Sequence, residues 1–69
     1  MSISGQAIVS KKARIKEDVE IGAFAIVEDD VEISSGVKIW PRAHICSGTS
    51  IDEGTEVHMG AVVGHLPQD

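Results

Sequence analysis

An aliphatic residue recurs at every sixth position along almost the whole chain. These positions hold only isoleucine and valine: Ile3, Val9, Ile15, Ile21, Val27, Ile33, Ile39, Ile45, Ile51, Val57 and Val63. Two residues before each of them stands a small or apolar residue: Met1, Ala7, Ala13, Val19, Ala25, Val31, Val37, Ala43, Thr49, Thr55 and Ala61. A fixed short period of this kind indicates a repeat architecture.

The period of six excludes an amphipathic helix and favours strands. Six residues rotate an α-helix by about 240°, which would spread the aliphatic positions around the axis. In an extended segment, residues two apart lie on the same side, so each hexad supplies one small and one large inward residue. β-Branched residues suit such a pleated surface.

The third residue after each aliphatic position is expected to form a tight corner. These positions hold Gln6, Lys12, Asp18, Phe24, Asp30, Gly36, Arg42, Gly48, Gly54 and Gly60. Glycine and aspartate predominate among them, and both tolerate a left-handed backbone conformation. Three hexads then close a triangular coil, and stacked coils pair their strands in parallel sheets. The sequence therefore predicts an all-β solenoid of about four coils over residues 1–64.

Composition narrows the class of protein further. Hydrophobic residues make up 42% of the chain but aromatic residues only 3%, which fits thin aliphatic layers. The net charge of −5 makes a nucleic-acid partner unexpected, because phosphate binding needs clustered basic residues. Cys46 is the only cysteine, so a disulfide framework is excluded and a cytoplasmic setting is expected. We expect no membrane span and read no signal peptide.

The rhythm stops at the final residues, "GHLPQD". A continued repeat would place a small inward residue at 67 and an aliphatic one at 69, where the chain has Pro67 and Asp69. Burial of an unpaired carboxylate is costly, so we expect the backbone to leave the coil. Residues 65–69 are therefore interpreted as the start of a loop.

Two stretches carry a family resemblance that covers essentially the whole chain. The segments "ISGQAIVSKKARIKEDVEIGAFAIVEDDVEI" and "GTSIDEGTEVHMGAVVGHLPQD" resemble the N-terminal coils of the UDP-N-acetylglucosamine O-acyltransferase family. The hexads are shared with other transferases and with γ-class carbonic anhydrases, whereas the Pro67-Gln68-Asp69 ending is more discriminating. The resemblance implies a left-handed parallel β-helix, although ordinary parallel crossovers are right-handed.

The resemblance also implies a function in lipid A biosynthesis. Members transfer a 3-hydroxyacyl group from acyl carrier protein to the 3-hydroxyl of UDP-N-acetylglucosamine, without a cofactor, and act as homotrimers. Carried over to this chain, Gln68 and Asp69 become substrate-contact residues, with Gln68 near the acyl donor and Asp69 near the sugar. The catalytic histidine of the family corresponds to a position beyond residue 69, so we expect no catalytic residue and no turnover in the isolated chain.

The three histidines are candidate bases and candidate metal ligands. His44 and His58 flank inward residues and should point outward into solvent or packing contacts. His65 is adjacent to the predicted loop and is a third substrate-contact candidate. In a coil of eighteen residues none of these histidines stacks on another, so we expect no zinc site and no metal-ligating residues.

Other residues have plainer interpretations. Cys46 stacks between Glu28 and Gly64 of the neighbouring coils, with no base that the sequence identifies beside it, so it is expected to be a packing or surface thiol. Trp40 should project outward beneath His58, either at a subunit interface or in local packing. The basic cluster is interrupted by acidic residues and is interpreted as a solvated face; it comprises Lys11, Lys12, Arg14 and Lys16.

Two alternatives to the acyltransferase remain open at this point. One is a non-catalytic β-helix that serves structure or association. The other is a fragment of a different hexapeptide transferase or of a γ-carbonic-anhydrase-like protein. The Pro67-Gln68-Asp69 ending favours the acyltransferase, and the unstacked histidines argue against the metalloenzyme.

Overall fold

The structure is a computed structural model that describes residues 2–64. Eleven strands of two residues each follow one another along the chain. Their bounds are β1 Ser2–Ile3, β2 Ile8–Val9, β3 Arg14–Ile15, β4 Glu20–Ile21, β5 Ile26–Val27, β6 Glu32–Ile33, β7 Lys38–Ile39, β8 His44–Ile45, β9 Ser50–Ile51, β10 Glu56–Val57 and β11 Val62–Val63. Each strand ends on one of the aliphatic positions of the repeat, as the sequence predicts.

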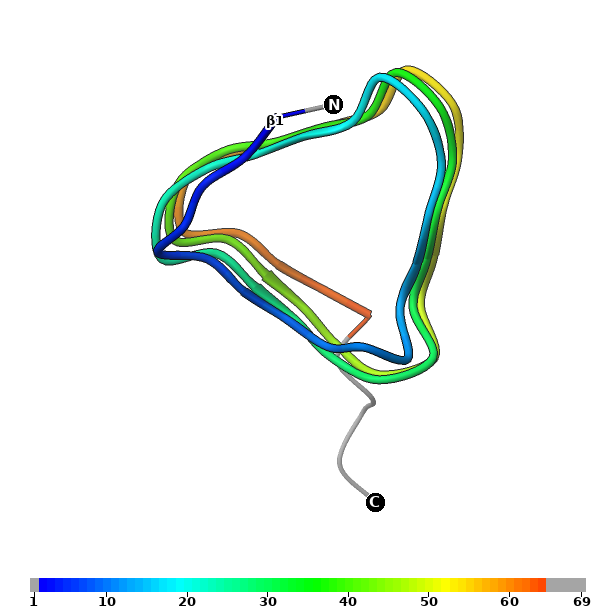
Figure 1. The fold of residues 1–69 in the computed structure, drawn as a ribbon, viewed down its shortest axis with the longest axis horizontal. Coiled ribbons are helices and arrows are strands. Elements are labelled where there is room, and N and C mark those ends of the chain that lie inside the picture. The colour runs from blue at the N-terminus through cyan, green and yellow to red at the C-terminus, as the bar shows by residue number, and fades with distance from the viewer. Residues whose placement is uncertain (1, 65–69) are drawn as a thin grey trace.

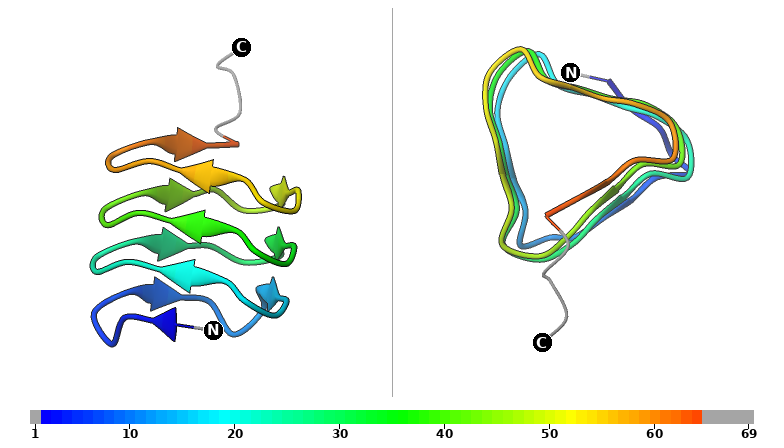
Figure 2. Two further views of the ribbon diagram at one scale, coloured as in Figure 1. Left: turned by 90° about the horizontal axis from the view of Figure 1, so that it is seen from above. Right: turned by 180° about the vertical axis from the view of Figure 1, so that it is seen from behind.

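The strands form three parallel sheets, one on each side of a triangular prism (Figure 1). Their orders are β1-β4-β7-β10, β2-β5-β8-β11 and β3-β6-β9. Paired residues are eighteen positions apart, as in Ile3 with Ile21 and Val27 with Ile45. The side view shows the near strands running leftward while the chain rises from coil to coil, which makes the solenoid left-handed (Figure 2).

The eleven strands make three full coils and two sides of a fourth, slightly fewer than the expected four. Backbone hydrogen bonds join successive coils: the Ile8 N–H donates to the Ala25 carbonyl at 2.8 Å, and the Arg14 N–H to the Val31 carbonyl at 2.8 Å. Such ladders pair each inner strand with the strand above and the strand below, whereas the strands at the two ends of each sheet have one partner. The described part of the chain has no helix that is long and apolar enough to cross a membrane.

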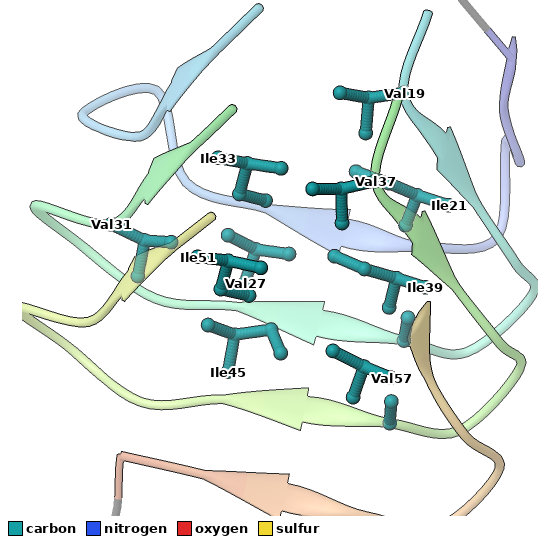
Figure 3. Packing of buried hydrophobic residues seen from close by; sticks show 12 residues of the cluster. Val19, Ile21, Val27, Val31, Ile33, Val37, Ile39, Ile45, Ile51 and Val57 are labelled. Atoms are coloured by element: carbon teal, nitrogen blue, oxygen red, sulfur yellow. The ribbon is translucent and has the colours of Figure 1, made fainter. Parts of the chain in front are cut away.

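The interior consists of the two inward positions of each hexad (Figure 3). The buried residues are Val19, Ile21, Ala25, Val27, Val31, Ile33, Val37, Ile39, Ala43, Ile45, Ile51 and Val57. All twelve belong to the aliphatic and small-residue sets of the repeat. No polar or charged residue among residues 2–64 is classed as buried, so the core is a stack of aliphatic layers.

The corners confirm the prediction of a left-handed backbone at eight of the ten expected positions. Glycine supplies this conformation at four of them, and Asp18, Phe24, Asp30 and Arg42 adopt φ values of 58–66°. The first two corners of the first coil, at Gln6 and Lys12, are stabilised differently. There the N–H groups of Gln6 and Lys12 donate to the hydroxyls of Ser4 and Ser10, at 3.1 and 3.0 Å.

Candidate functional site

The predicted substrate-contact residues, His65, Gln68 and Asp69, lie outside the described residues. The structure does describe the point at which the chain approaches them. Val63 is still in register with Ile45, but Gly64 already has φ of 85°. Among residues 2–64, every other positive φ comes three residues after an aliphatic position, whereas the one at Gly64 comes directly after Val63.

Gly64 also lies very close to the Thr49 side chain in the coil below. A Cβ atom built on Gly64 would stand 1.8 Å from the Thr49 Oγ1 atom. Both the backbone angle and this approach favour glycine at 64, because another residue would be strained there and would displace the Thr49 side chain. The hexad geometry therefore changes at Gly64, immediately before the residues of the predicted loop.

A shallow groove of about 350 Å³ runs along the outer side of the second sheet. Ile8, Ile26 and Val27 supply its apolar lining, while its polar side consists of Ser10, Glu28, Asp29 and Ser47. The polar residues lie at one corner of three successive coils, which brings them together although they are far apart in sequence. The Ser10 hydroxyl donates to the Asp29 carboxylate, and the Ser47 hydroxyl donates to the Asp29 carbonyl oxygen at 2.9 Å.

Glu28, His44 and Cys46 form a cluster at this groove. His44 and Cys46 flank the inward Ile45, so both side chains project to the outer side of β8. Glu28 lies one coil below Cys46, and its Oε2 atom is 2.5 Å from His44 Nε2. One carboxylate oxygen, one ring nitrogen and the Cys46 sulfur lie within 4.8 Å of one another.

The surroundings of Glu28 stabilise its charged form. The His44 ring and, second, the Ser47 backbone N–H at 2.9 Å from Oε1 hold the pKa of the Glu28 carboxyl below its ordinary value. The side chains of His44 and Glu28 are 35% and 40% exposed, so the cluster is open to solvent and to small ligands.

The sequence predicts part of this arrangement and misses the rest. His44 does point outward, as expected, and its backbone pairs with that of Val62 in the next coil. Glu28 and Cys46 stand eighteen residues apart, which already stacks one above the other. The approach of His44 to both of them was missed, although the signal was present: His44 and Cys46 are two residues apart and therefore share the outer side of the strand.

A second outer cluster surrounds Trp40. The ring lies beneath His58, with ring centroids 5.6 Å apart, which confirms the predicted outward projection. Lys38 Nζ is 4.6 Å from the centre of the indole ring, and the Trp40 Nε1–H donates to Glu56 Oε1 at 3.1 Å. These contacts join β7 and β10 on the outer side of the first sheet, and they account for Trp40 by local packing.

Of the four residues in the basic cluster, Arg14 makes an ion pair across coils. Its guanidinium lies 2.6 Å from the Glu32 carboxylate, and both side chains are mostly exposed. The hydrogen bond and charge of Glu32 raise the pKa of Arg14 above its ordinary value. Solvent screens exposed pairs of this type, so they contribute little stability, which agrees with the interpretation of a solvated face.

Left-handed coiling, hexad strands and an aliphatic interior define the class of protein as a hexapeptide-repeat β-helix. The family model for the bacterial transferase hexapeptide (six repeats) matches residues 30–65. The chain therefore belongs to the bacterial transferase hexapeptide family.

The individual relatives of this chain share the name of one enzyme. The chain is 38% identical over 69 residues to the acyl-(acyl-carrier-protein)–UDP-N-acetylglucosamine O-acyltransferase of Syntrophobacter fumaroxidans, covering 100% of this chain and 27% of the relative. It is 32% identical over 68 residues to the enzyme of that name from Chlamydia pneumoniae, with 99% of this chain and 24% of the relative covered. It is 36% identical over 63 residues to the enzyme of that name from Psychrobacter sp., with 91% of this chain and 24% of the relative covered.

These relatives confirm the resemblance inferred from the hexads and the chain ending. The chain spans about a quarter of the length of the relatives it matches. The match extends through the ending "GHLPQD" in the first of them, because all 69 residues are aligned.

Proposed function

We propose that this chain forms the first coils and the beginning of the substrate loop of an acyltransferase. The reaction is transfer of a 3-hydroxyacyl group from acyl carrier protein to the 3-hydroxyl of UDP-N-acetylglucosamine, in lipid A biosynthesis. The observation that carries the proposal is the alignment of the entire chain with an acyltransferase of that name. The hexapeptide solenoid on which the loop begins supports it.

The chain's contribution to the reaction is substrate contact. Acyl transfer to a hydroxyl requires a base within about 2.6–3.2 Å of the oxygen that attacks the thioester. We propose that Gln68, Asp69 and His65 contact substrate and that the base belongs to a segment beyond residue 69. Gln68 would lie near the acyl donor and Asp69 near the sugar, where a carboxylate can accept hydrogen bonds from hydroxyl groups.

We propose further that the complete protein is a homotrimer in the cytoplasm. A single unpaired cysteine, Cys46, fits a reducing compartment. Closed symmetric assemblies are the usual form of soluble oligomers, and a threefold arrangement would place each substrate loop beside a neighbouring subunit. Sedimentation equilibrium of the purified protein would give a mass of three chains if the proposal is right and of one chain if it is wrong.

A chimera tests the proposed residues. In it, the present chain replaces the aligned segment of the Syntrophobacter fumaroxidans relative, so that the later parts of that enzyme follow Asp69. We expect the chimera to acylate UDP-N-acetylglucosamine when supplied with 3-hydroxyacyl carrier protein. Gln68→Ala and Asp69→Ala should each lower kcat/KM by about tenfold or more, the usual effect of losing a hydrogen bond to a charged or polar substrate group.

Matched substitutions elsewhere on the solenoid serve as controls. Gln6→Ala and Asp52→Ala change the same residue types at exposed positions of the described coils and should leave kcat/KM unchanged. A folded chimera without activity would favour the alternative of a non-catalytic β-helix. Equal losses at all four positions would show that the effect is general and that the loop residues have no special role.

A further inference from the structure

We propose that Glu28, His44 and Cys46 form a zinc-binding site on the outer face of the second sheet. The site consists only of described residues, and it does not depend on the proposed acyltransferase activity. It departs from the sequence-based expectation of no metal site, which considered only sets of histidines. Here the ligands come from two successive coils of one chain.

The three side chains offer the ligand types that zinc prefers. Thiolate sulfur, imidazole nitrogen and carboxylate oxygen all bind Zn²⁺, at about 2.0–2.3 Å. Harder cations such as Mg²⁺ and Ca²⁺ favour sets made of oxygen alone, so the sulfur and nitrogen select against them. Three protein ligands leave a fourth tetrahedral position for water or another small ligand.

The distances suit a small metal ion. Ligand atoms around a tetrahedral zinc stand roughly 3.5 Å apart, given those bond lengths. In this cluster one ligand atom from each residue lies within 4.8 Å of the other two, and the closest pair, Glu28 Oε2 and His44 Nε2, is 2.5 Å apart. These side chains are partly exposed, so rotations can move their ligand atoms by about 1 Å. Such rotations would lengthen the distance between Glu28 Oε2 and His44 Nε2 and shorten the distances to the Cys46 sulfur, so that all three approach those around zinc.

Packing and backbone hydrogen bonds fix the strands that carry the proposed ligands. Ile45, between His44 and Cys46, is fully buried, and Val27, just before Glu28, is 1% exposed. The Glu28 N–H donates to the Ile45 carbonyl at 3.0 Å, and the Cys46 N–H to the Val63 carbonyl at 2.9 Å. The ligands therefore project from paired strands whose inward residues are packed, which is the kind of support that preorganises a site.

A second layer of contacts orients the carboxylate. The Ser47 N–H donates to Glu28 Oε1 at 2.9 Å, leaving Oε2 directed at His44. Hydrogen bonds of this type to ligand carboxylates strengthen metal sites. Glu28 also lines the groove beside Ile8 and Ile26, so the cluster adjoins the groove.

The test uses the full chain, reduced and freed of metal, titrated with Zn²⁺ against a chromophoric chelator. We expect one zinc ion per chain. Cys46→Ser, His44→Ala and Glu28→Gln should each raise Kd by at least about tenfold, since even loss of outer-layer contacts costs this much. His58→Ala removes an exposed histidine outside the cluster and should leave Kd unchanged.

Two readouts keep the test informative if a variant folds poorly. Co²⁺ bound to the unaltered chain should show the absorption of a cobalt–thiolate bond, which His58→Ala retains and Cys46→Ser loses. Because Cys46 is the only cysteine, Zn²⁺ should also slow its alkylation in the unaltered chain. Absence of zinc binding by the unaltered chain, equal Kd values for Cys46→Ser and the unaltered chain, or no protection from alkylation would each overturn the proposal.

Discussion

Several single residues are constrained by a close neighbour or by an unusual backbone conformation. Gly22 is one of them: a Cβ atom there would stand 2.6 Å from the backbone nitrogen of Pro41 in the next coil. Phe24 is another, because it adopts φ of 62° although its side chain is bulky and 53% exposed. A left-handed backbone costs such residues conformational free energy that glycine is spared.

Gly22→Ala should destabilise the chain. The close atoms belong to the backbone and ring of Pro41, which cannot move aside as a flexible side chain would. We expect the free energy of unfolding to fall by about 1–3 kcal/mol, as for other overpacked sites. Gly5→Ala is the matched control, since nothing lies within 4 Å of a Cβ built on Gly5, and it should change stability little. Equal effects at both positions in chemical denaturation would contradict the close approach of Pro41 to Gly22.

Substitution of Phe24 separates the backbone conformation from the ring. Phe24→Ala and Phe24→Gly both remove the contact with Arg42, whose guanidinium lies 5.9 Å from the ring centre. Only glycine also relieves the left-handed backbone, so Phe24→Gly should be the more stable variant by about 1 kcal/mol. At a position with ordinary φ the order would be reversed, because glycine loses more backbone entropy. Denaturation of the two variants in parallel measures the difference, and a more stable alanine variant would refute the assigned φ.

At the level of elements, each strand is two residues long and depends on its neighbours. The inward residue packs against the aliphatic layers above and below, and the outward residue faces solvent or a cross-coil partner. Ile39 is 1% exposed, whereas Ile8, the outward residue of β2, is 65% exposed. The hydrophobic contribution of a strand therefore comes almost entirely from one of its two residues.

This difference between the two sides of a strand can be measured with one substitution. Ile39→Val removes a buried methyl group and should lower the free energy of unfolding by about 0.5–1.5 kcal/mol. Ile8→Val makes the same chemical change on the outer side, and its free energy of unfolding should stay within about 0.5 kcal/mol of that of the unaltered chain. A larger loss for Ile8→Val, measured by chemical denaturation, would mean that the inward and outward sides had been assigned wrongly.

Sequence periodicity is sufficient to predict the strands because, from β4 to β10, each strand has a buried aliphatic residue preceded by a residue that is not buried. Ile21, Ile39 and Val57 fall in one inner column by their spacing alone, and they pair in that order. Corners are harder to predict, since Gln6 and Lys12 depend on hydroxyls supplied by the preceding serines.

The candidate sites differ in how far the sequence determines them. Spacing stacks Glu28 on Cys46, but the approach of His44 to both depends on side-chain rotamers, which no repeat pattern specifies. The loop residues stay predictions, because they lie outside the described residues; they are His65, Gln68 and Asp69.

At the scale of the whole molecule, the stacked coils form a support for the predicted loop. Successive coils contact one another through the three sheets, so its stability is close to a sum of coil and interface contributions. Such a support fixes the point at which the hexad geometry changes, at Gly64. In the proposed enzyme, the residues after that point bind substrate and another part of the complete protein supplies the base.

The most direct test is the rate of acyl transfer to UDP-N-acetylglucosamine, measured side by side for the isolated chain and for the chimera with the Syntrophobacter fumaroxidans enzyme. We predict turnover by the chimera and none by the isolated chain, because a positioned general base is required and this chain is proposed to lack it. The Gln68→Ala and Asp69→Ala chimeras should be slower than the Gln6→Ala and Asp52→Ala controls. Turnover by the isolated chain, or a folded chimera that is inactive, would contradict the proposed division of roles.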